Sequence, residues 1–289
     1  MLVLQRPVWR RVMTDPVLTD AQWKVLEPLL PILGGTRRGR PYCQSHRTTL
    51  EAILWIAQAG TSWRFLPREY GKWKSVHRRF RRWVNAKIFE RIFETMASML
   101  DLDIIMVDGT FIKVHQSAAG ARREGRSRAA SREQQAIGRS KGGLNTLLVA
   151  LVDKNGRFIR YALQPGNSSE HRNVTSLIGD LPANEFLGDG LYDSDKLRFY
   201  LTTRGIKPTI PPRKNRKAKL EFDRHSYMGR HTIENVFADL KQFRGIATRY
   251  CKLADSFRGY LDLVMWVIGT RETRRSASPY HRDLSPLPV

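Results

Sequence analysis

Hydrophobic residues in the first hundred positions recur every three or four residues, which is the spacing of one helix face. The first such segment begins at Thr19, which forms a capping-box pattern with Gln22, and it ends before Pro31. The second covers residues 47–60 and ends at Gly60, a residue type that often follows a helix. Their apolar stripes are Trp23, Leu26 and Leu30 in the first segment, and Leu50, Ile53, Leu54 and Ala57 in the second. The pattern predicts an all-α region over residues 1–98.

A third helix is predicted over residues 75–84 (SVHRRFRRWV), where an apolar stripe runs beside a dense set of arginines. The stripe consists of Val76, Phe80 and Trp83, and the remaining surface carries Arg78, Arg79, Arg81 and Arg82. Such a helix can lie on DNA in a helix-turn-helix-like module, with arginines contacting phosphates or base edges. The alternative is a basic face that contacts solvent alone.

From residue 99 the pattern changes to strands alternating with helices. Three strands come first, followed by helix-strand units and a last helix that contains Glu234. The strands are predicted at 103–114, 147–156, 157–166, 184–190 and 207–212, and the intervening helices at 170–181 and 194–205. This order predicts an α/β domain over residues 99–270, with a mixed sheet flanked by helices. Residues 271–289, rich in Ser, Pro and Arg, are predicted to be a flexible C-terminal tail.

The net charge of the chain indicates what kind of partner the protein binds. The 289 residues include 50 Lys and Arg against 27 Asp and Glu, a net charge of +23, which favours binding to a polyanion such as nucleic acid. Two basic segments, 119–143 and 211–219, are too polar to bury and are predicted to be mobile loops that contact DNA. The second carries Arg213, Lys214, Arg216 and Lys217. The alternative for both segments is a solubilising loop.

The two cysteines and the apolar segments of the chain indicate the cellular compartment in which we expect the protein. Cys43 and Cys251 stand far apart without a CxxC or Cys/His cluster, so neither a zinc knuckle nor a disulfide framework is predicted. The N-terminal residues lack a signal-peptide pattern, and the apolar stretch 260–270 is short and interrupted by Asp262. We expect no membrane partner and a cytoplasmic, nucleoid-associated protein of bacterial type.

The stretch YMGRHTIENVFADLK (227–241) places charged residues beside an apolar stripe. At about 100° per residue, Arg230, Glu234 and Lys241 share one helix face. The neighbouring apolar face, which predicts packing on a core, consists of Ile233, Val236, Leu240 and Phe243. The arrangement suits metal and phosphate chemistry, but ion pairs on a surface helix would have the same spacing.

Two further carboxylates lie in predicted strands, Asp108 within the first strand and Asp189 at the end of a short one. Asp108 ends an apolar run, and Asp189 takes a similar place before Gly190. With Glu234 they would form a three-carboxylate cluster, which would repel itself unless it bound divalent cations. Oxygen ligands suit Mg²⁺ or Mn²⁺, and two ions about 4 Å apart could activate a nucleophile and stabilise a leaving oxygen.

Asp193 and Asp195 compete with Asp189 for the second place in this cluster. The sequence Tyr192-Asp193-Ser194 resembles the start of a helix, where Asp193 or Ser194 would serve as a cap. Asp189 is therefore the favoured candidate.

These residues together resemble the DDE transposases of bacterial insertion sequences, and most closely the insertion sequence 5 family. The resemblance covers most of the chain. It is carried by LTDAQWKVLEPLLP and GTSWRFLPREYGKWKSVHRRFRRW in the N-terminal region, and by VDGTFIKVHQSAAGA, AIGRSKGGLNT, LGDGLYDSDKLR and RHTIENVFADLKQFRGIATRYCKL after it. The most specific motif is Tyr227-x2-Arg230-x3-Glu234-x6-Lys241.

The resemblance implies an RNase H-like fold for the second domain and a role for each motif residue. Asp108, Asp189 and Glu234 would be the catalytic, metal-binding triad, and Tyr227, Arg230 and Lys241 would touch transposon-end DNA. Two departures stand out. Gly109 replaces the serine that often follows the first Asp, and Glu234 follows Asp189 by 45 positions (234 − 189), too few for a large β-rich insertion. The route of second-strand cleavage therefore stays open.

The function predicted from the sequence is a Mg²⁺- or Mn²⁺-dependent transposase that uses two metal ions. It would bind the inverted-repeat ends of its element, hydrolyse a phosphodiester to expose a 3′-OH, and direct that hydroxyl at target DNA. Its partners would be double-stranded DNA, at transposon ends and target, and further copies of the chain in a homodimer or higher oligomer. The alternatives are an RNase H-like nuclease or resolvase without strand transfer, and a catalytically inactive DNA-binding regulator.

Overall fold

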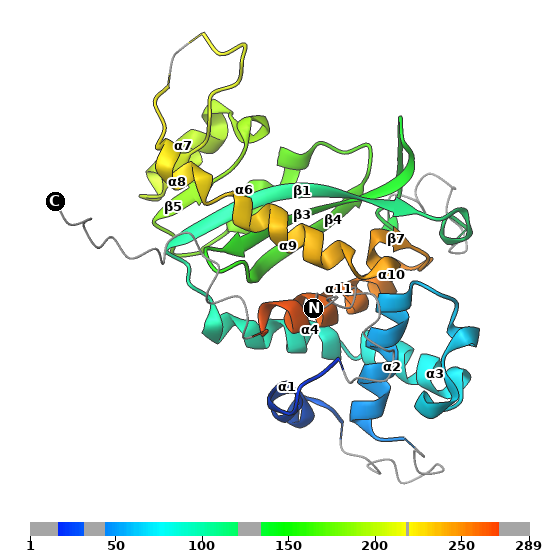
Figure 1. Ribbon diagram of the computed structural model, residues 1–289. Helices are drawn as coiled ribbons and strands as arrows, with labels where there is room; N and C mark the ends of the chain where they lie inside the picture. The colour runs from blue at the N-terminus through cyan, green and yellow to red at the C-terminus, as the bar shows by residue number, and fades with distance from the viewer. Residues whose placement is uncertain (1–16, 32–43, 121–133, 218–219, 272–289) are drawn as a thin grey trace, which may run out of the picture.

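A mixed β-sheet forms the centre of the computed structural model, which describes residues 17–31, 44–120, 134–217 and 220–271 (Figure 1). The long strand β3 pairs antiparallel with β1, β2 and β4, whereas β1, β5 and β6 pair in parallel. The short strand β7 joins the far end of β1. The strands are β1 (Ile104–Val114), β2 (Gly138–Ser140), β3 (Gly143–Asp153), β4 (Phe158–Pro165), β5 (Glu185–Leu187), β6 (Lys207–Thr209) and β7 (Thr248–Arg249).

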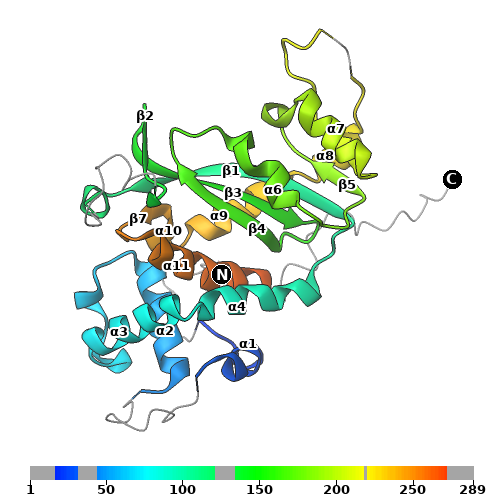
Figure 2. The same ribbon diagram turned by 180° about the vertical axis from the view of Figure 1, so that it is seen from behind.

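Helices cover both faces of the sheet. Figure 1 shows α9 lying across one face, and Figure 2 shows α6 on the opposite face. Alternate residues of β1 divide between the two cores: Met106 packs with residues of α9, and Val107 packs with residues of α6 and α7. The helices after β4 are α6 (Val174–Ile178), α7 (Asp195–Thr203), α8 (Arg224–Met228), α9 (His231–Lys241), α10 (Arg244–Ala247) and α11 (Ala254–Gly269). The predicted α/β class, a mixed sheet flanked by helices, is confirmed.

The described residues before β1 form helices and short 3-10 turns. The helices are α1 (Asp20–Leu26), α2 (His46–Ala59), α3 (Trp73–Asn85) and α4 (Ile88–Glu94). Thr19 and Gln22 form the predicted capping box of α1, and Gly60 ends α2 with a φ of 64°. The helices α2, α3 and α4 all contact α11, so the N-terminal region shares a hydrophobic core with the far end of the chain. The boundary predicted at residue 98 stays a prediction.

Two parts of the fold differ from the sequence prediction. Residues 227–241 are not one helix, because tight hydrogen bonds from Gly229 N to Ser226 O and from Arg230 N to Tyr227 O separate α8 from α9. The long helix α11 was absent from the predicted element order. It is buried on nearly all sides, so its sequence lacks the polar face that marks an amphipathic helix.

Several predictions lie outside the described residues. These concern Cys43, most of the first basic segment and the C-terminal tail beyond Arg271. In the part of the chain that the structure describes, no helix combines the length and apolar character needed to span a membrane.

Candidate active site

The register between two parallel strands brings the predicted aspartates to one place. β1 and β5 pair through Met106 and Leu187, and two further residues along each strand lead to Asp108 and Asp189. Both side chains are partly buried, and the two carboxylates repel each other electrostatically. The sheet therefore places two of the three predicted acids side by side.

The helix α9 brings the third acid to the same face of the sheet. Its apolar residues Ile233, Val236 and Leu240 are fully buried against the core, as the sequence predicted, and this packing anchors the first turn that carries Glu234. α9 contacts β1 directly. Glu234 itself is exposed, with half of its side-chain surface accessible.

The guanidinium group of Arg230 bridges two of the acids. It lies 3.2 Å from Asp108 Oδ2 and 2.5 Å from Glu234 Oε1, and it also attracts Asp189 electrostatically. Its side chain is mostly buried. The ion pair between Arg230 and Glu234, which the sequence left open as an alternative, is thus part of a larger arrangement in which Arg230 interacts with all three carboxylates.

Burial controls the protonation of Asp108. Desolvation raises the pKa of this carboxyl, with a further contribution from the Asp189 charge, although Arg230 and the backbone N–H of Gly109 act in the opposite direction. Among the described residues, no group of three or more His, Cys, Asp or Glu side chains has the geometry to hold a metal ion. Asp108 and Asp189 interact electrostatically and Glu234 is linked to Asp108 through Arg230, but the three acids do not form a closed ligand set.

The other two residues of the sequence motif lie in different surroundings. Tyr227 is on α8, where its ring contacts Phe222 edge to face and its centroid lies 6.0 Å from the Arg230 guanidinium carbon. Lys241 lies in the last turn of α9, two turns and about 10 Å along the axis from Glu234. Partial burial lowers the pKa of Lys241.

The arginine-rich helix α3 presents only part of its predicted basic face. Val76, Phe80 and Trp83 form the buried stripe as predicted, and Arg78 and Arg82 are exposed. The prediction that Arg79 lies on the surface is wrong: only 5% of the residue is accessible. Its guanidinium donates to the carbonyl oxygens of Gln44 and Ser45 and to Thr49 Oγ1, which anchors the start of α2.

Arg81 is only half-exposed, because its guanidinium donates to Ser256 Oγ on α11. The candidate DNA-contacting surface of α3 is therefore narrower than the sequence indicated.

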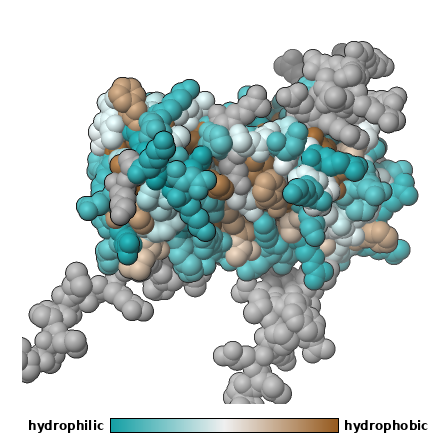
Figure 3. Space-filling view, turned by 90° about the horizontal axis from the view of Figure 1, so that it is seen from above, coloured by the Kyte–Doolittle hydropathy of each residue, from teal (hydrophilic) through white to brown (hydrophobic). Residues whose placement is uncertain are grey.

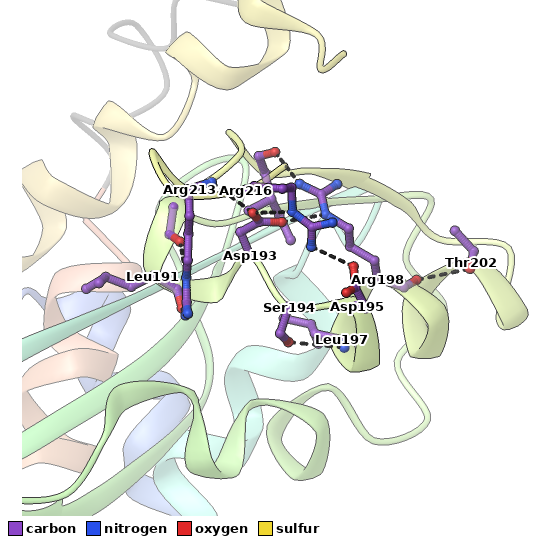
Figure 4. A network of polar contacts seen from close by, with 11 residues as sticks. Leu191, Asp193, Ser194, Asp195, Leu197, Arg198, Thr202, Arg213 and Arg216 are labelled. Carbon is purple, nitrogen blue, oxygen red and sulfur yellow. Dashed lines mark hydrogen bonds and ion pairs between the residues drawn. The ribbon is translucent and has the colours of Figure 1, made fainter. Parts of the chain in front are cut away.

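The turn that carries Asp189 is held by a buried acid four residues later (Figure 4). The side chain of Asp193 is completely inaccessible and accepts hydrogen bonds from Arg198 Nε (2.7 Å), Arg216 Nε (2.8 Å) and the backbone N–H of Arg213 (2.8 Å). Burial alone would raise the pKa of Asp193, but these hydrogen bonds lower it to about 2. Asp193 is a structural anchor, which supports the preference for Asp189.

Two residues of the second basic segment also bind within the protein. Arg213 donates to the carbonyl oxygens of Gly190 and Leu191, and Arg216 bridges Asp193 and Asp195. The prediction that 211–219 is simply a mobile basic loop is therefore wrong for this part, whereas Lys214 and Lys217 are exposed. Sequence reasoning missed Arg198 as a partner of Asp193. Its place one turn into the helix capped by Ser194 was the available signal.

The structure thus has a mixed sheet with Asp108 on β1, Asp189 just beyond the parallel strand β5, and Glu234 on a covering helix. The comparison with protein families is specific: residues 100–261 match the family "Transposase DDE domain", and residues 18–93 match "Putative transposase of IS4/5 family". The first match covers more than half of the chain, so the chain belongs to the DDE transposases. This family generally uses divalent metal ions.

Relatives with sequence similarity come from three bacteria. An "Uncharacterized protein y4sN" from Sinorhizobium fredii is 38% identical over 106 residues, 37% of this chain and 83% of the relative. A "Putative transposase for insertion sequence element IS6501" from Brucella ovis is 31% identical over 131 residues, 44% of this chain and all of the relative. An "Insertion element IS402 uncharacterized 16.2 kDa protein" from Burkholderia cepacia is 32% identical over 111 residues, 35% of this chain and 76% of the relative.

Two solved complexes of Mos1 transposase align with 86% of this chain and 84% of theirs. One is a pre-cleavage transpososome and the other a paired-end complex with the left transposon end, at 13% and 14% identity and a TM-score of 0.24 each. A TM-score of 0.24 is too low to support an argument, so the fold rests on the strand order of the chain itself.

Proposed function

We propose that this DDE transposase binds the inverted-repeat ends of an insertion sequence and catalyses their cleavage and strand transfer at the site formed by Asp108, Asp189 and Glu234. The observation that supports the proposal is that Arg230 pairs with Asp108 on β1 and Glu234 on α9 and interacts electrostatically with Asp189, just beyond β5. A large positive net charge supports a DNA substrate. The upper face of the molecule, seen in Figure 3, is mainly hydrophilic, with hydrophobic residues in separate small groups.

The donor chemistry of the site fits Mg²⁺ or Mn²⁺, because all three candidate ligands are carboxylates. Asp108 and Glu234 already share one positive charge, that of Arg230. When bound, one or two divalent ions would activate the attacking water or hydroxyl and offset charge on the departing oxygen. Arg230 would compete with such ions for Asp108 and Glu234, and a DNA phosphate would offer its guanidinium another partner.

The protein side chains then have distinct tasks. Asp108 is held by β1, Asp189 by the turn after β5 and Glu234 by a packed helix, and these supports would position the reacting phosphodiester relative to the acids. Exposed basic residues outside the site, among them Lys214, Lys217, Arg78 and Arg82, would bind the DNA backbone. Synapsis of two ends favours a homodimer or a higher oligomer on DNA.

The direct test is a joint assay with labelled inverted-repeat DNA, supercoiled plasmid and Mg²⁺ or Mn²⁺. We expect the wild-type protein to expose a 3′-OH and join it to the plasmid. Asp108→Asn, Asp189→Asn and Glu234→Gln should each lose both products while retaining binding to end DNA. Cleavage without joining would favour a nuclease or resolvase. Unchanged cleavage by Asp108→Asn would overturn the assignment of the site.

A further inference from the structure

The turn between β5 and α7 carries Asp189 and is closed by backbone hydrogen bonds from Tyr192 N to Asp189 O and from Asp193 N to Gly190 O. Asp189 Oδ1 accepts a hydrogen bond of 2.8 Å from Leu191 N, so the orientation of the carboxylate depends on the backbone of the 3-10 turn Gly190–Tyr192. Gly190 is only partly buried, and the Leu191 side chain is exposed. Tyr192 is fully buried and anchors the far end of the turn, and the carbonyl oxygens of Gly190 and Leu191 have a further contact from a neighbouring loop.

The side chain of Arg213 provides that contact. Its Nε donates to the carbonyl oxygen of Gly190 at 3.0 Å, and its Nη2 donates to the carbonyl oxygen of Leu191. Figure 4 shows the guanidinium reaching across to Leu191 from the neighbouring loop. The planar fork of arginine suits two adjacent acceptors, which a lysine ammonium cannot bind with the same geometry.

The backbone of Arg213 is fixed in turn by Asp193. The N–H of Arg213 donates to Asp193 Oδ2, and the same buried carboxylate binds Arg198 and Arg216. Arg198 also donates to the carbonyl oxygen of Ile210, which ties the chain that leaves β6 to α7. Asp193 thus holds the start of the basic loop, and the loop holds the turn after Asp189.

We propose that Arg213 is a positioning residue, which with Asp193 clamps the Asp189 turn, and that its role in the reaction is not to contact DNA. The proposal rests on the assignment of Asp189 to the active site. Both Arg213 and Lys214 are exposed, but Lys214 has the charge without the clamp, so the proposal predicts different roles for these two neighbours.

Three variants distinguish the clamp from a DNA contact. Arg213→Ala removes the charge and the clamp, Arg213→Lys keeps the charge and removes the paired hydrogen bonds, and Lys214→Ala removes a neighbouring charge alone. For cleavage of end DNA, we expect kcat to fall about tenfold or more in both Arg213 variants, with Kd and its salt dependence unchanged in Arg213→Lys. Lys214→Ala should instead weaken DNA binding and reduce the salt slope by about 1.

Hydrogen exchange of the DNA-free protein gives a readout that does not depend on activity. Amides in residues 188–194 should exchange about tenfold faster in both Arg213 variants than in the wild type, and at the wild-type rate in Lys214→Ala. Unchanged exchange in the Arg213 variants, or full wild-type cleavage by Arg213→Lys, would overturn the clamp. If exchange increases but Asp189→Asn still cleaves DNA, the clamp stands and the proposed function fails.

Discussion

Arg230 is the residue on which the electrostatics of the candidate active site depend. Its guanidinium pairs with Asp108 and Glu234 in a mostly buried position, where an unpaired carboxylate would be costly. Removal of the arginine leaves those two acids without a compensating charge. A divalent cation is the simplest replacement, because it can bind the same oxygens.

We therefore expect Arg230→Gln to bind Mn²⁺ more tightly than the wild type in the absence of DNA. The variant no longer has an internal cation that competes for Asp108 and Glu234, and we expect an increase in affinity of about tenfold, or ~1.4 kcal/mol. Isothermal titration or Mn²⁺ electron paramagnetic resonance would measure it. Its unfolding temperature should be lower than that of the wild type without metal and should recover when Mn²⁺ is added.

Lys241→Gln is the matched control for this experiment. It removes one positive charge from the same helix, about 10 Å from Glu234, where no ion pair with the acids is present among the described contacts. Its Mn²⁺ affinity should equal that of the wild type. Equal affinities in Arg230→Gln and the wild type would contradict the view that Arg230 and the metal compete.

At the scale of elements, the sequence predicted those helix starts and ends that depend on interactions between neighbouring residues. The capping box at Thr19 and the stop at Gly60 depend on neighbours in sequence, and the structure contains both. The three acids could be picked out as candidates from an acid within an apolar strand, an acid at a strand end and helix spacing, and their role stays a prediction. The bridge made by Arg230 and the inward turn of Arg79 depend on contacts with distant segments, which no local pattern encodes.

Gly60, at the end of α2, must be a glycine partly because α10 packs directly against it. Its φ is 64°, and a Cβ at this position would lie 2.8 Å from Arg244 Cβ and 2.9 Å from the Arg244 carbonyl carbon on α10. Gly60→Ala should therefore destabilise the protein through both backbone strain and a steric clash. We expect a loss of about 2 kcal/mol or more in the free energy of unfolding, measured by urea denaturation.

A substitution at Gly205 separates the cost of backbone strain from the cost of the steric clash. It has a φ of 72° after α7, but nothing lies within 4 Å of a Cβ built there. Gly205→Ala should lose only the backbone term, about 1 kcal/mol. A cost for Gly60→Ala no larger than that for Gly205→Ala would show that the contact between α2 and α10 yields without strain.

Helix α11, which the sequence pattern did not reveal, contains a buried acid with a pH-dependent cost. Burial raises the pKa of Asp262 to about 7, although a hydrogen bond from Tyr161 and the charge of Arg258 act to lower it. Because the folded-state pKa lies above the unfolded value near 3.8, the protonated form favours folding. The contribution of Asp262 to folding stability is fully present below about pH 4 and is lost as the pH rises through 7.

Asp262→Asn removes the titration and tests this dependence. Relative to the wild type, the variant should gain stability between pH 4 and pH 8, by up to about 4 kcal/mol, because the asparagine stays neutral as the wild-type carboxyl ionises. Chemical denaturation of both proteins at several pH values would measure the difference. A stability difference that stays constant across this range would contradict a raised pKa in the folded state.

At the scale of the whole molecule, the helices before β1 and the sheet are joined through α11, which contacts both. This arrangement connects the basic helix α3 to the same rigid core that carries the three acids. DNA held by α3 would therefore be held at a defined distance from the site. The sequence could not indicate this connection, because it depends on packing between residues more than 150 positions apart, such as Phe80 and Tyr260.

The salt dependence of DNA binding tests which arginines of α3 take part. Each phosphate contact contributes about 0.9 to the slope of log K against log salt concentration, so Arg78→Ala combined with Arg82→Ala should reduce the slope by about 1.8. These residues are exposed, and the unfolding temperature should stay near the wild-type value.

Arg79→Ala should behave in the opposite way, although it lies between the other two in the sequence. Its buried guanidinium satisfies Gln44 O, Ser45 O and Thr49 Oγ1, so its loss should cost about 2 kcal/mol or more of stability. At a temperature where the variant remains folded, its salt slope should equal that of the wild type. Binding titrations at four or more salt concentrations, with denaturation curves for each protein, measure both quantities. A reduced slope with unchanged stability in Arg79→Ala would mean that this arginine turns outward to meet DNA.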